Sequence, residues 1–422
     1  ESDRIIGELY GENPADPRLP YSLGRIRQAD GQFDAARTLY ERAIEIDPGY
    51  RDAYVRIATV YRMSDENDLS LDYLIRALDN GEADPEIETR IGDGFRILEQ
   101  HDLARASYQS AIELEPHSLD ARLALAYYYN RSGTMAGYQA AIEQLEYVES
   151  AGVDEIELHA LFADARYHLG DLNSAEVRME RILGDIEEET NADYLYLMGR
   201  IRFDNAEAFD AAGNTEQAAE SYRTAQQAFH LAFTRGRDSS ETRYWEARSH
   251  LALGDFGHAV PAFRRSLDLS VEEGKVRGEY NYWLGFSLEL ERNYPQALDA
   301  YIRTDRFDLA WALENPVLFF RRGRLLANTA QLRAAERDFR WALVLDPDNY
   351  DAAAALARVY SQQQDFDGAI QLWRQSLAIH EAQPRVHYDL GMLLNRFDQF
   401  DDARLHLERA KALDYGETAP LL

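Results

Sequence analysis

The feature that most constrains this chain is a repeat of 34 residues. Five residues recur at a spacing of 68, twice 34: Gly24 with Gly92, Ala36 with Ala104, Tyr40 with Tyr108, Ala43 with Ala111, and Pro48 with Pro116. When small insertions are allowed, eleven units fill residues 17–417, starting at Pro17, Arg51, Pro85, Leu119, Ile156, Ala192, Ser240, Gly278, Pro316, Tyr350 and Pro384. Such a period is typical of solenoids, in which each unit buries its apolar face against its neighbours.

Each unit is predicted to contain two helices joined by a turn. In the first unit, residues 21–29 and 33–46 have the apolar spacing of helices, and Asp30-Gly31 separates them. Proline cannot continue a helix, so Asp47-Pro48 ends the second one, and Glu115-Pro116 and Asp346-Pro347 end their helices in the same way. The pattern therefore predicts an all-α chain.

Three positions of the unit predict how its helices pack. The eighth residue of every unit is Gly or Ala, and the twentieth is Ala or, once, Ser. The twenty-fourth is large and apolar in every unit: Tyr40, Leu74, Tyr108, Leu145, Met179, Tyr222, Phe263, Tyr301, Phe339, Trp373 and Leu407. We interpret the small residues as holes that let the helices approach closely, and the bulky residue as the knob that fills the gap.

These residues resemble the tetratricopeptide repeat family, in which a small residue at position 8, Ala at 20, an aromatic at 24, Ala at 27 and Pro at 32 form the signature. Three units match it best: Gly24-Ala36-Tyr40-Ala43-Pro48, Gly92-Ala104-Tyr108-Ala111-Pro116 and Gly323-Ala335-Phe339-Ala342-Pro347. The resemblance covers about 400 residues. It implies a right-handed superhelix (an α-solenoid) and a scaffold for protein–protein interaction, without naming a partner.

The units are not all alike, and this suggests a domain organisation. We expect an N-terminal helix or cap in residues 1–16, units one to five in 17–190, an elongated sixth unit in 191–239, units seven to eleven in 240–417, and a tail in 418–422. In the sixth unit, residues 192–212 and 215–234 each read as helices about two turns too long. This unit is either a joint between two arms or a bulge in one uninterrupted superhelix.

The resemblance also places candidate binding residues, because family positions 2, 5, 9, 12 and 13 point into the concave groove. Those positions carry a net charge of −1 here, whereas the whole chain carries −30. Aromatic residues recur at position 5 and arginines at position 9, and two neighbours complete the candidate set: Tyr21, Tyr196, Tyr244, Tyr282, Phe320 and Tyr388; Arg25, Arg200, Arg248, Arg324 and Arg358; Phe286 and Arg321.

Aromatic and arginine side chains are the types that carry most binding energy at protein interfaces. The candidate set therefore predicts a groove for an extended or helical protein segment with apolar and acidic side chains. An alternative is that some of these aromatic rings pad the inside of the superhelix and that the arginines pair with acids on neighbouring helices. For the C-terminal members, from Tyr282 to Tyr388, we favour binding.

Composition excludes several other functions. The chain has 45 basic and 75 acidic residues, which argues against a non-specific grip on nucleic acid or an anionic lipid surface. It has no run of 18 apolar residues, so no membrane insertion is expected. It also has no cysteine, no phosphate-binding loop and no pair of histidines at helical spacing. No catalytic residue, cofactor or metal site is predicted, and we expect the chain not to be an enzyme.

Several alternatives stay open at this stage. The chain could be a self-assembling structural scaffold, or the regulatory or interaction portion of a larger envelope or enzyme complex. The first residue is Glu1 rather than Met, so we expect that a leader or tag has been removed. The absence of cysteine favours a bacterial, periplasmic protein, with the cytoplasm as the alternative.

Overall fold

The structure is a computed structural model that describes residues 2–183 and 191–413. Within these residues it contains 24 α-helices and no β-strand, so the predicted all-α solenoid is confirmed. The predicted tail, 418–422, lies outside the described residues. The chain divides into two compact units, Glu1–Asp185 and Ile186–Leu422, which we describe separately.

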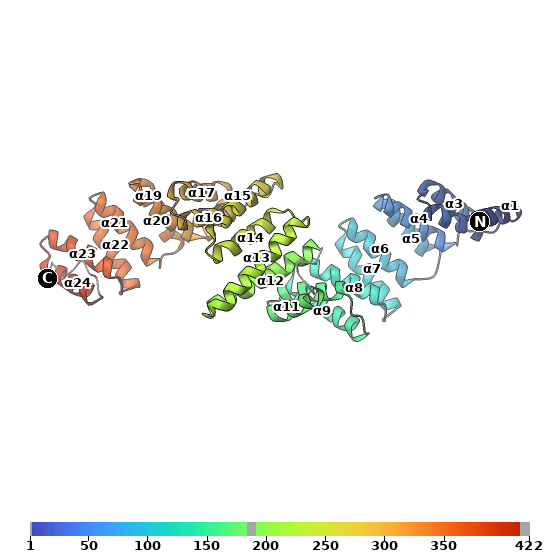
Figure 1. Cartoon of the computed structure of the whole chain (residues 1–422), viewed down its shortest axis with the longest axis horizontal. Helices are drawn as coiled ribbons and strands as arrows, with labels where there is room; N and C mark the ends of the chain where they lie inside the picture. Colours follow the sequence, from blue (N-terminus) through green and yellow to red (C-terminus); the bar gives the residue numbers. More distant parts are fainter. Residues whose placement is uncertain (1, 184–190, 414–422) are drawn as a thin grey trace. The chain divides into compact units, whose positions relative to one another are not determined.

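The N-terminal unit contains one leading helix and five helix pairs. Its helices are α1 (Ser2–Glu12), α2 (Arg18–Ala29), α3 (Phe33–Ile46), α4 (Arg51–Met63), α5 (Asn67–Asp79), α6 (Pro85–Ile97), α7 (His101–Leu114), α8 (Leu119–Arg131), α9 (Met135–Ser150), α10 (Ile156–His168) and α11 (Leu172–Ile182). Each helix packs against the next one along the chain, which is the neighbour-to-neighbour packing of a solenoid (Figure 1).

The C-terminal unit contains six helix pairs and one short extra helix. Its helices are α12 (Ala192–Ala211), α13 (Thr215–Thr234), α14 (Ser240–Ala252), α15 (Phe256–Glu272), α16 (Gly278–Leu290), α17 (Tyr294–Phe307), α18 (Leu309–Glu314), α19 (Pro316–Asn328), α20 (Leu332–Leu345), α21 (Tyr350–Gln362), α22 (Phe366–Ile379), α23 (Pro384–Arg396) and α24 (Phe400–Ala412). First helices of successive pairs also touch, as α14 does with α16 and α19 with α21.

The predicted knobs and holes lie in contact. A methyl group added to Gly24 would lie 2.6 Å from the Tyr40 ring, and one added to Gly92 would lie 2.5 Å from the Tyr108 ring. Both tyrosines are fully buried, and so are Ala36 and Ala104 at position 20. Close approach of the two helices at position 8 is therefore what accommodates the ring at position 24.

In the sixth pair the predicted knob is wrong. The ring against Gly199 belongs to Phe229, whose Cε1 would lie 2.7 Å from an added methyl, and not to Tyr222. Both α12 and α13 have 20 residues, so the contact at the start of α12 falls two turns further along α13 than in a 34-residue unit. Tyr222 instead packs edge-on against Phe203, with ring centroids 5.3 Å apart.

The short helix α18 was not predicted from the sequence. Asp308, the residue before the helix, accepts a hydrogen bond from the Trp311 backbone N–H at 3.0 Å through its carboxylate and so caps the helix. The Trp311 ring lies 5.3 Å from the ring of Tyr282, centroid to centroid. Helix α18, inserted between the eighth and ninth pairs, therefore packs against Tyr282, which the sequence analysis predicted to face the groove.

Candidate partner-binding surface

A register rule connects the first helices of successive pairs in the C-terminal unit. The residue at position 9 of one first helix lies against the residue at position 6 of the next. The Arg200 guanidinium carbon is 3.8 Å from the centroid of the Trp245 ring. Arg248 lies over Trp283, also at 3.8 Å. In the following pair the roles are exchanged, and Arg321 lies 4.2 Å from the Phe286 centroid. Three cation–π contacts thus run along α12, α14, α16 and α19.

Hydrogen bonds and ion pairs hold these arginines in place. Arg248 donates to the hydroxyl of Tyr244 at 3.1 Å and forms an ion pair with Glu207 at 3.1 Å. Arg321 forms an ion pair with Glu289 at 3.3 Å, and Arg200 donates to the hydroxyl of Tyr196 at 3.4 Å. Arg200 also lies 4.0 Å from the Asp204 carboxylate. Since acids of the protein already pair with these three arginines, they serve the structure of this surface rather than offer free cations to a partner.

Two of the predicted aromatic residues are part of the core. Tyr244 is 2% exposed and stacks on Tyr280 with centroids 4.5 Å apart; Tyr282 is 7% exposed. Burial raises the pKa of both hydroxyls. Tyr196 is half-buried beneath Arg237, and burial raises its pKa to about 12. The padding interpretation therefore describes Tyr244 and Tyr282, whose rings a partner would not reach.

The register rule also identifies arginines that have no aromatic residue at position 6 of the next first helix. In the unit that follows Arg324, position 6 is Ala355. In the unit that follows Arg25, position 6 is Arg56. Both Arg324 and Arg25 are exposed, and no ion pair joins either of them to another described residue. Arg324 lies 5.7 Å from the ring of Phe320 on its own helix. These two arginines are therefore free to meet an acidic group.

The other predicted residues lie at the two ends of the chain. Tyr21 is half-buried and packs against Tyr40 and Tyr50, with centroids 5.7 and 5.2 Å apart, at the edge of the first aromatic cluster. Tyr388 lies under Arg385, 5.9 Å from its guanidinium carbon, and Arg358 pairs with Asp389 at 3.1 Å.

A hollow of about 490 Å³ lies between α21, α22 and α23 at the C-terminal end. Its charged lining residues are Arg358, Arg385, Arg396 and Asp389, and Trp373 and Leu393 add apolar surface. Asp389 pairs with both Arg358 and Arg385, at 3.1 and 3.0 Å, so one acid faces three arginines. The lining therefore carries a net charge of +2 on a chain whose total charge is −30.

The N-terminal unit has a larger hollow of the opposite charge, about 920 Å³ between α6 and α8. Six carboxylates and two arginines line it: Asp84, Glu86, Asp93, Glu115, Asp120 and Glu157, with Arg90 and Arg96. None of the predicted binding residues lies there, because that prediction followed aromatic and arginine residues. The signal that could have identified it is the acid at groove position 2 of the third, fourth and fifth units: Glu86, Asp120 and Glu157.

Three histidine and aspartate side chains gather in a place that the sequence prediction missed. His250, at the end of α14, and His258, in the first turn of α15, both approach Asp255 in the connecting turn. The two histidines are eight residues apart, so a search for pairs at spacing three or four on one helix does not find them. Their register positions, on either side of a helix–helix turn, were the available signal.

Sequence comparisons link the chain to one family. Tetratricopeptide repeat models match residues 27–89, 203–270, 244–308, 320–384 and 355–417. Cellulose synthase operon protein C of Pseudomonas fluorescens is 26% identical over 152 residues, which are 33% of this chain and 12% of that protein. TPR repeat-containing protein YpiA of Bacillus subtilis is 26% identical over 81 residues, 19% of each chain. This chain thus spans less than a fifth of the curated relatives that it matches.

Among solved structures, a tetratricopeptide repeat protein from Parabacteroides merdae is 11% identical, with a TM-score of 0.44, over 65% of this chain and 99% of that one. The Cut9–Hcn1 tetramer of the APC/C gives 14% identity and a TM-score of 0.40, over 100% of this chain and 92% of the other. No helix in the described part of the chain combines the length and apolarity that crossing a bilayer requires.

Proposed function

We propose that this chain, which belongs to the tetratricopeptide repeat family, is a non-catalytic scaffold that holds an acidic segment of a partner protein at its C-terminal end. The observation that carries the proposal is the arginine-lined hollow between α21 and α23. Arg358, Arg385 and Arg396 face it with a single acid among them. A basic hollow on a chain of charge −30 is the arrangement that a carboxylate-bearing ligand needs.

The surroundings of the hollow support a protein segment as its ligand. Arg396 is exposed, and no acid among the described residues pairs with it; its guanidinium carbon lies 4.8 Å from the Phe366 ring. Leu393 adds an apolar contact in the hollow, and exposed Arg324 offers a further cation on α19. Arginine beside apolar surface suits a segment that alternates acidic and apolar side chains.

The cation–π contacts give this surface a rigid frame. Arg200, Arg248 and Arg321 join four successive first helices before any partner arrives. A partner that binds to an ordered surface loses less conformational entropy in the complex than one that has to order its receptor. In the scaffold that we propose, Arg200, Arg248 and Arg321 are structural, and the contact is made by the hollow whose three arginines share the single acid Asp389.

Capture of partners from a native extract tests the proposal. The parent chain is compared with the variant Arg358→Ala/Arg396→Ala. The matched control is Arg333→Ala/Arg337→Ala, which removes the same charge from α20, the second helix of the ninth pair. We expect one protein or complex to be retained by the parent and the control, and lost with the first variant. Retention of the same proteins by all three chains, or of this chain alone, would contradict the proposal and favour self-assembly.

The alternative role is an interaction portion of a larger complex in the cell envelope. One relative carries the name of a cellulose synthase operon, although this chain covers only 12% of that protein. The same capture experiment addresses this role, since copurification of an enzyme through the C-terminal hollow would identify the complex. Fractionation of the native cells would test the periplasmic location, which remains part of the proposal.

A further inference from the structure

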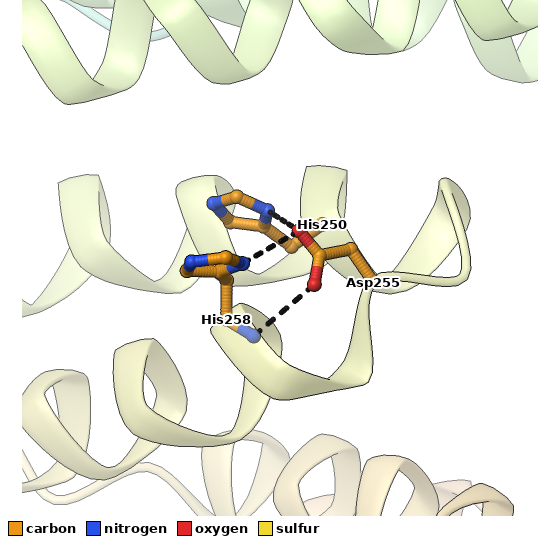
Figure 2. Close-up of side chains that lie close together, drawn as sticks. All are labelled: His250, Asp255 and His258. Atoms are coloured by element: carbon orange, nitrogen blue, oxygen red, sulfur yellow. Dashed lines mark hydrogen bonds and ion pairs between the residues drawn. The ribbon is translucent and has the colours of Figure 1, made fainter.

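In the turn between α14 and α15, two histidine rings contact the carboxylate of one aspartate, Asp255. The Nδ1 atoms of His250 and His258 lie 3.2 and 2.7 Å from the same oxygen, Oδ2 of Asp255. The two imidazoles are nearly parallel, with centroids 5.3 Å apart and an interplanar angle of 24°. Figure 2 shows both rings on one side of the carboxylate, while its other oxygen accepts a bond from the His258 backbone.

Helix capping explains the aspartate but not the histidines. Asp255 caps α15 through Oδ1, which accepts a hydrogen bond from the His258 backbone N–H at 3.3 Å. Asp171 and Asp365 cap α11 and α22 in the same way, and neither has a histidine pair on its carboxylate. The two imidazoles on Oδ2 are therefore an addition to a common turn of this solenoid, and they leave the cap intact.

We propose that His250, Asp255 and His258 bind a divalent transition-metal ion, with Zn²⁺ as the expected metal. A candidate ligand atom from each residue lies within 4.8 Å of the other two, and no other group of this kind occurs in residues 2–183 and 191–413. Tetrahedral Zn²⁺ accepts imidazole nitrogen and carboxylate oxygen at about 2.0–2.2 Å, so small side-chain rotations bring the three atoms onto one ion.

The positive charges beside the site are compensated by acids. Two arginines line the adjoining hollow of about 440 Å³, but each is already paired. Arg243 pairs with buried Glu246, and Arg265 pairs with Asp238 at 3.3 Å. Their positive charge is thereby offset near the ion.

The site would have one open coordination position. Three protein ligands leave the fourth tetrahedral position to water or to a side chain from a bound protein. His230 lines the same hollow and donates a hydrogen bond from Nδ1 to the Glu246 carboxylate at 3.0 Å, so this histidine is near the site but already bound to that acid. The ion would also tie the end of α14 to the start of α15 and make this turn more rigid.

Calorimetric titration of the metal-free full chain, without a histidine tag, tests the site. ZnCl₂ is added in the presence of excess MgCl₂, which occupies sites built only from carboxylates. The variants are Asp255→Asn, which can still cap the helix, and His258→Gln, at a side chain that is 75% exposed. The controls are Asp365→Asn, at an equivalent cap, and His101→Gln, at an exposed histidine elsewhere.

We expect the parent and both controls to bind one Zn²⁺ per chain. Asp255→Asn and His258→Gln should each weaken this binding at least tenfold, while circular dichroism shows unchanged helix content. Failure of the parent to bind Zn²⁺ saturably would overturn the inference. So would either variant binding as tightly as the parent, because the three residues would then not be the ligands. Neither result bears on the arginine-lined hollow, which uses other helices.

Discussion

The guanidinium of Arg248 lies 3.8 Å from the centroid of the Trp283 indole and so joins the first helices of the seventh and eighth pairs. Arg248 also pairs with Glu207 on the preceding first helix at 3.1 Å. One side chain therefore contacts three successive first helices, α12, α14 and α16. Arg324 occupies the same position two pairs later, and position 6 of the next first helix is Ala355, which has no ring to stack on. Arg248 and Arg324 therefore provide a direct comparison of a structural arginine with a free one.

Arg248→Ala should destabilise the C-terminal unit by about 1–3 kcal/mol, through loss of a cation–π contact, an ion pair and a hydrogen bond. Arg324→Ala should change stability by less than about 0.5 kcal/mol, since it is exposed and unpaired. Urea unfolding followed by tryptophan fluorescence and circular dichroism measures both. Equal effects from the two substitutions would mean that the contacts of Arg248 with the neighbouring first helices do not stabilise the fold.

Gly92→Ala should cost about 1–3 kcal/mol, because the added methyl would lie 2.5 Å from the Tyr108 ring. The second substitution Tyr108→Leu should restore part of that loss, as Ala58 and Leu74 occupy the same two positions in the second pair. A double-mutant cycle in urea measures the coupling. Additive costs would show that the glycine is not required by this ring.

Asp338→Asn should destabilise the C-terminal unit by about 3–5 kcal/mol. Asp338 is fully buried and forms a two-pronged ion pair with buried Arg322, at 2.7 and 3.0 Å. Asp305 also pairs with this guanidinium, at 3.0 Å, but the substitution removes the carboxylate that binds it at two points. Replacing both residues together, as Arg322→Met/Asp338→Leu, should cost less than Asp338→Asn alone. A larger cost for the double variant would refute this explanation.

The pair His387 and His406 should make stability fall as the pH is lowered below about 6.5. Burial lowers the pKa of both rings in the folded chain, so the unfolded chain binds more protons below its own pKa. The stabilisation is complete above pH 6.5 and is lost as the pH falls toward the folded pKa values. Their Nδ1 atoms lie 3.0 Å apart, a contact that protonation of His387 would break.

Urea midpoints at pH 8 and pH 5.5 measure this effect. Loss of carboxylate charge also changes stability over this range, so the informative quantity is the difference between the parent and His387→Gln/His406→Gln. The variant should show a smaller decrease on acidification than the parent. An identical decrease in both chains would assign the pH dependence to other groups.

Local periodicity was enough to predict the helix pairs, because each pair obeys rules that span only 34 residues. Small residues at position 8 and a ring at position 24 identify contacts such as Gly24 with Tyr40 without any long-range information. The same approach failed at Tyr222, where a longer helix moved the contact to Phe229, and at α18, which lies outside the repeat. Periodicity predicts a contact only where the period holds.

The binding residues were harder to predict, since a residue's role depends on its neighbour in the next pair. Arg248 and Arg324 have the same register position, yet only Arg324 is free. The sequence does contain this information at position 6 of the following unit, where Trp283 or Ala355 stands. Burial of Tyr282 depends on Trp311, and the approach of His250 to His258 depends on a turn, so those required the structure.

The affinity of the captured partner for the C-terminal end tests the central claim most directly. Its dissociation constant would be measured at low and high salt for the parent, for Arg358→Ala/Arg396→Ala and for the control Arg333→Ala/Arg337→Ala. The account predicts binding at least tenfold weaker for the first variant, within twofold of the parent for the control, and weaker in high salt for the parent. Equal affinities for all three chains would contradict the proposed arginine-lined binding surface.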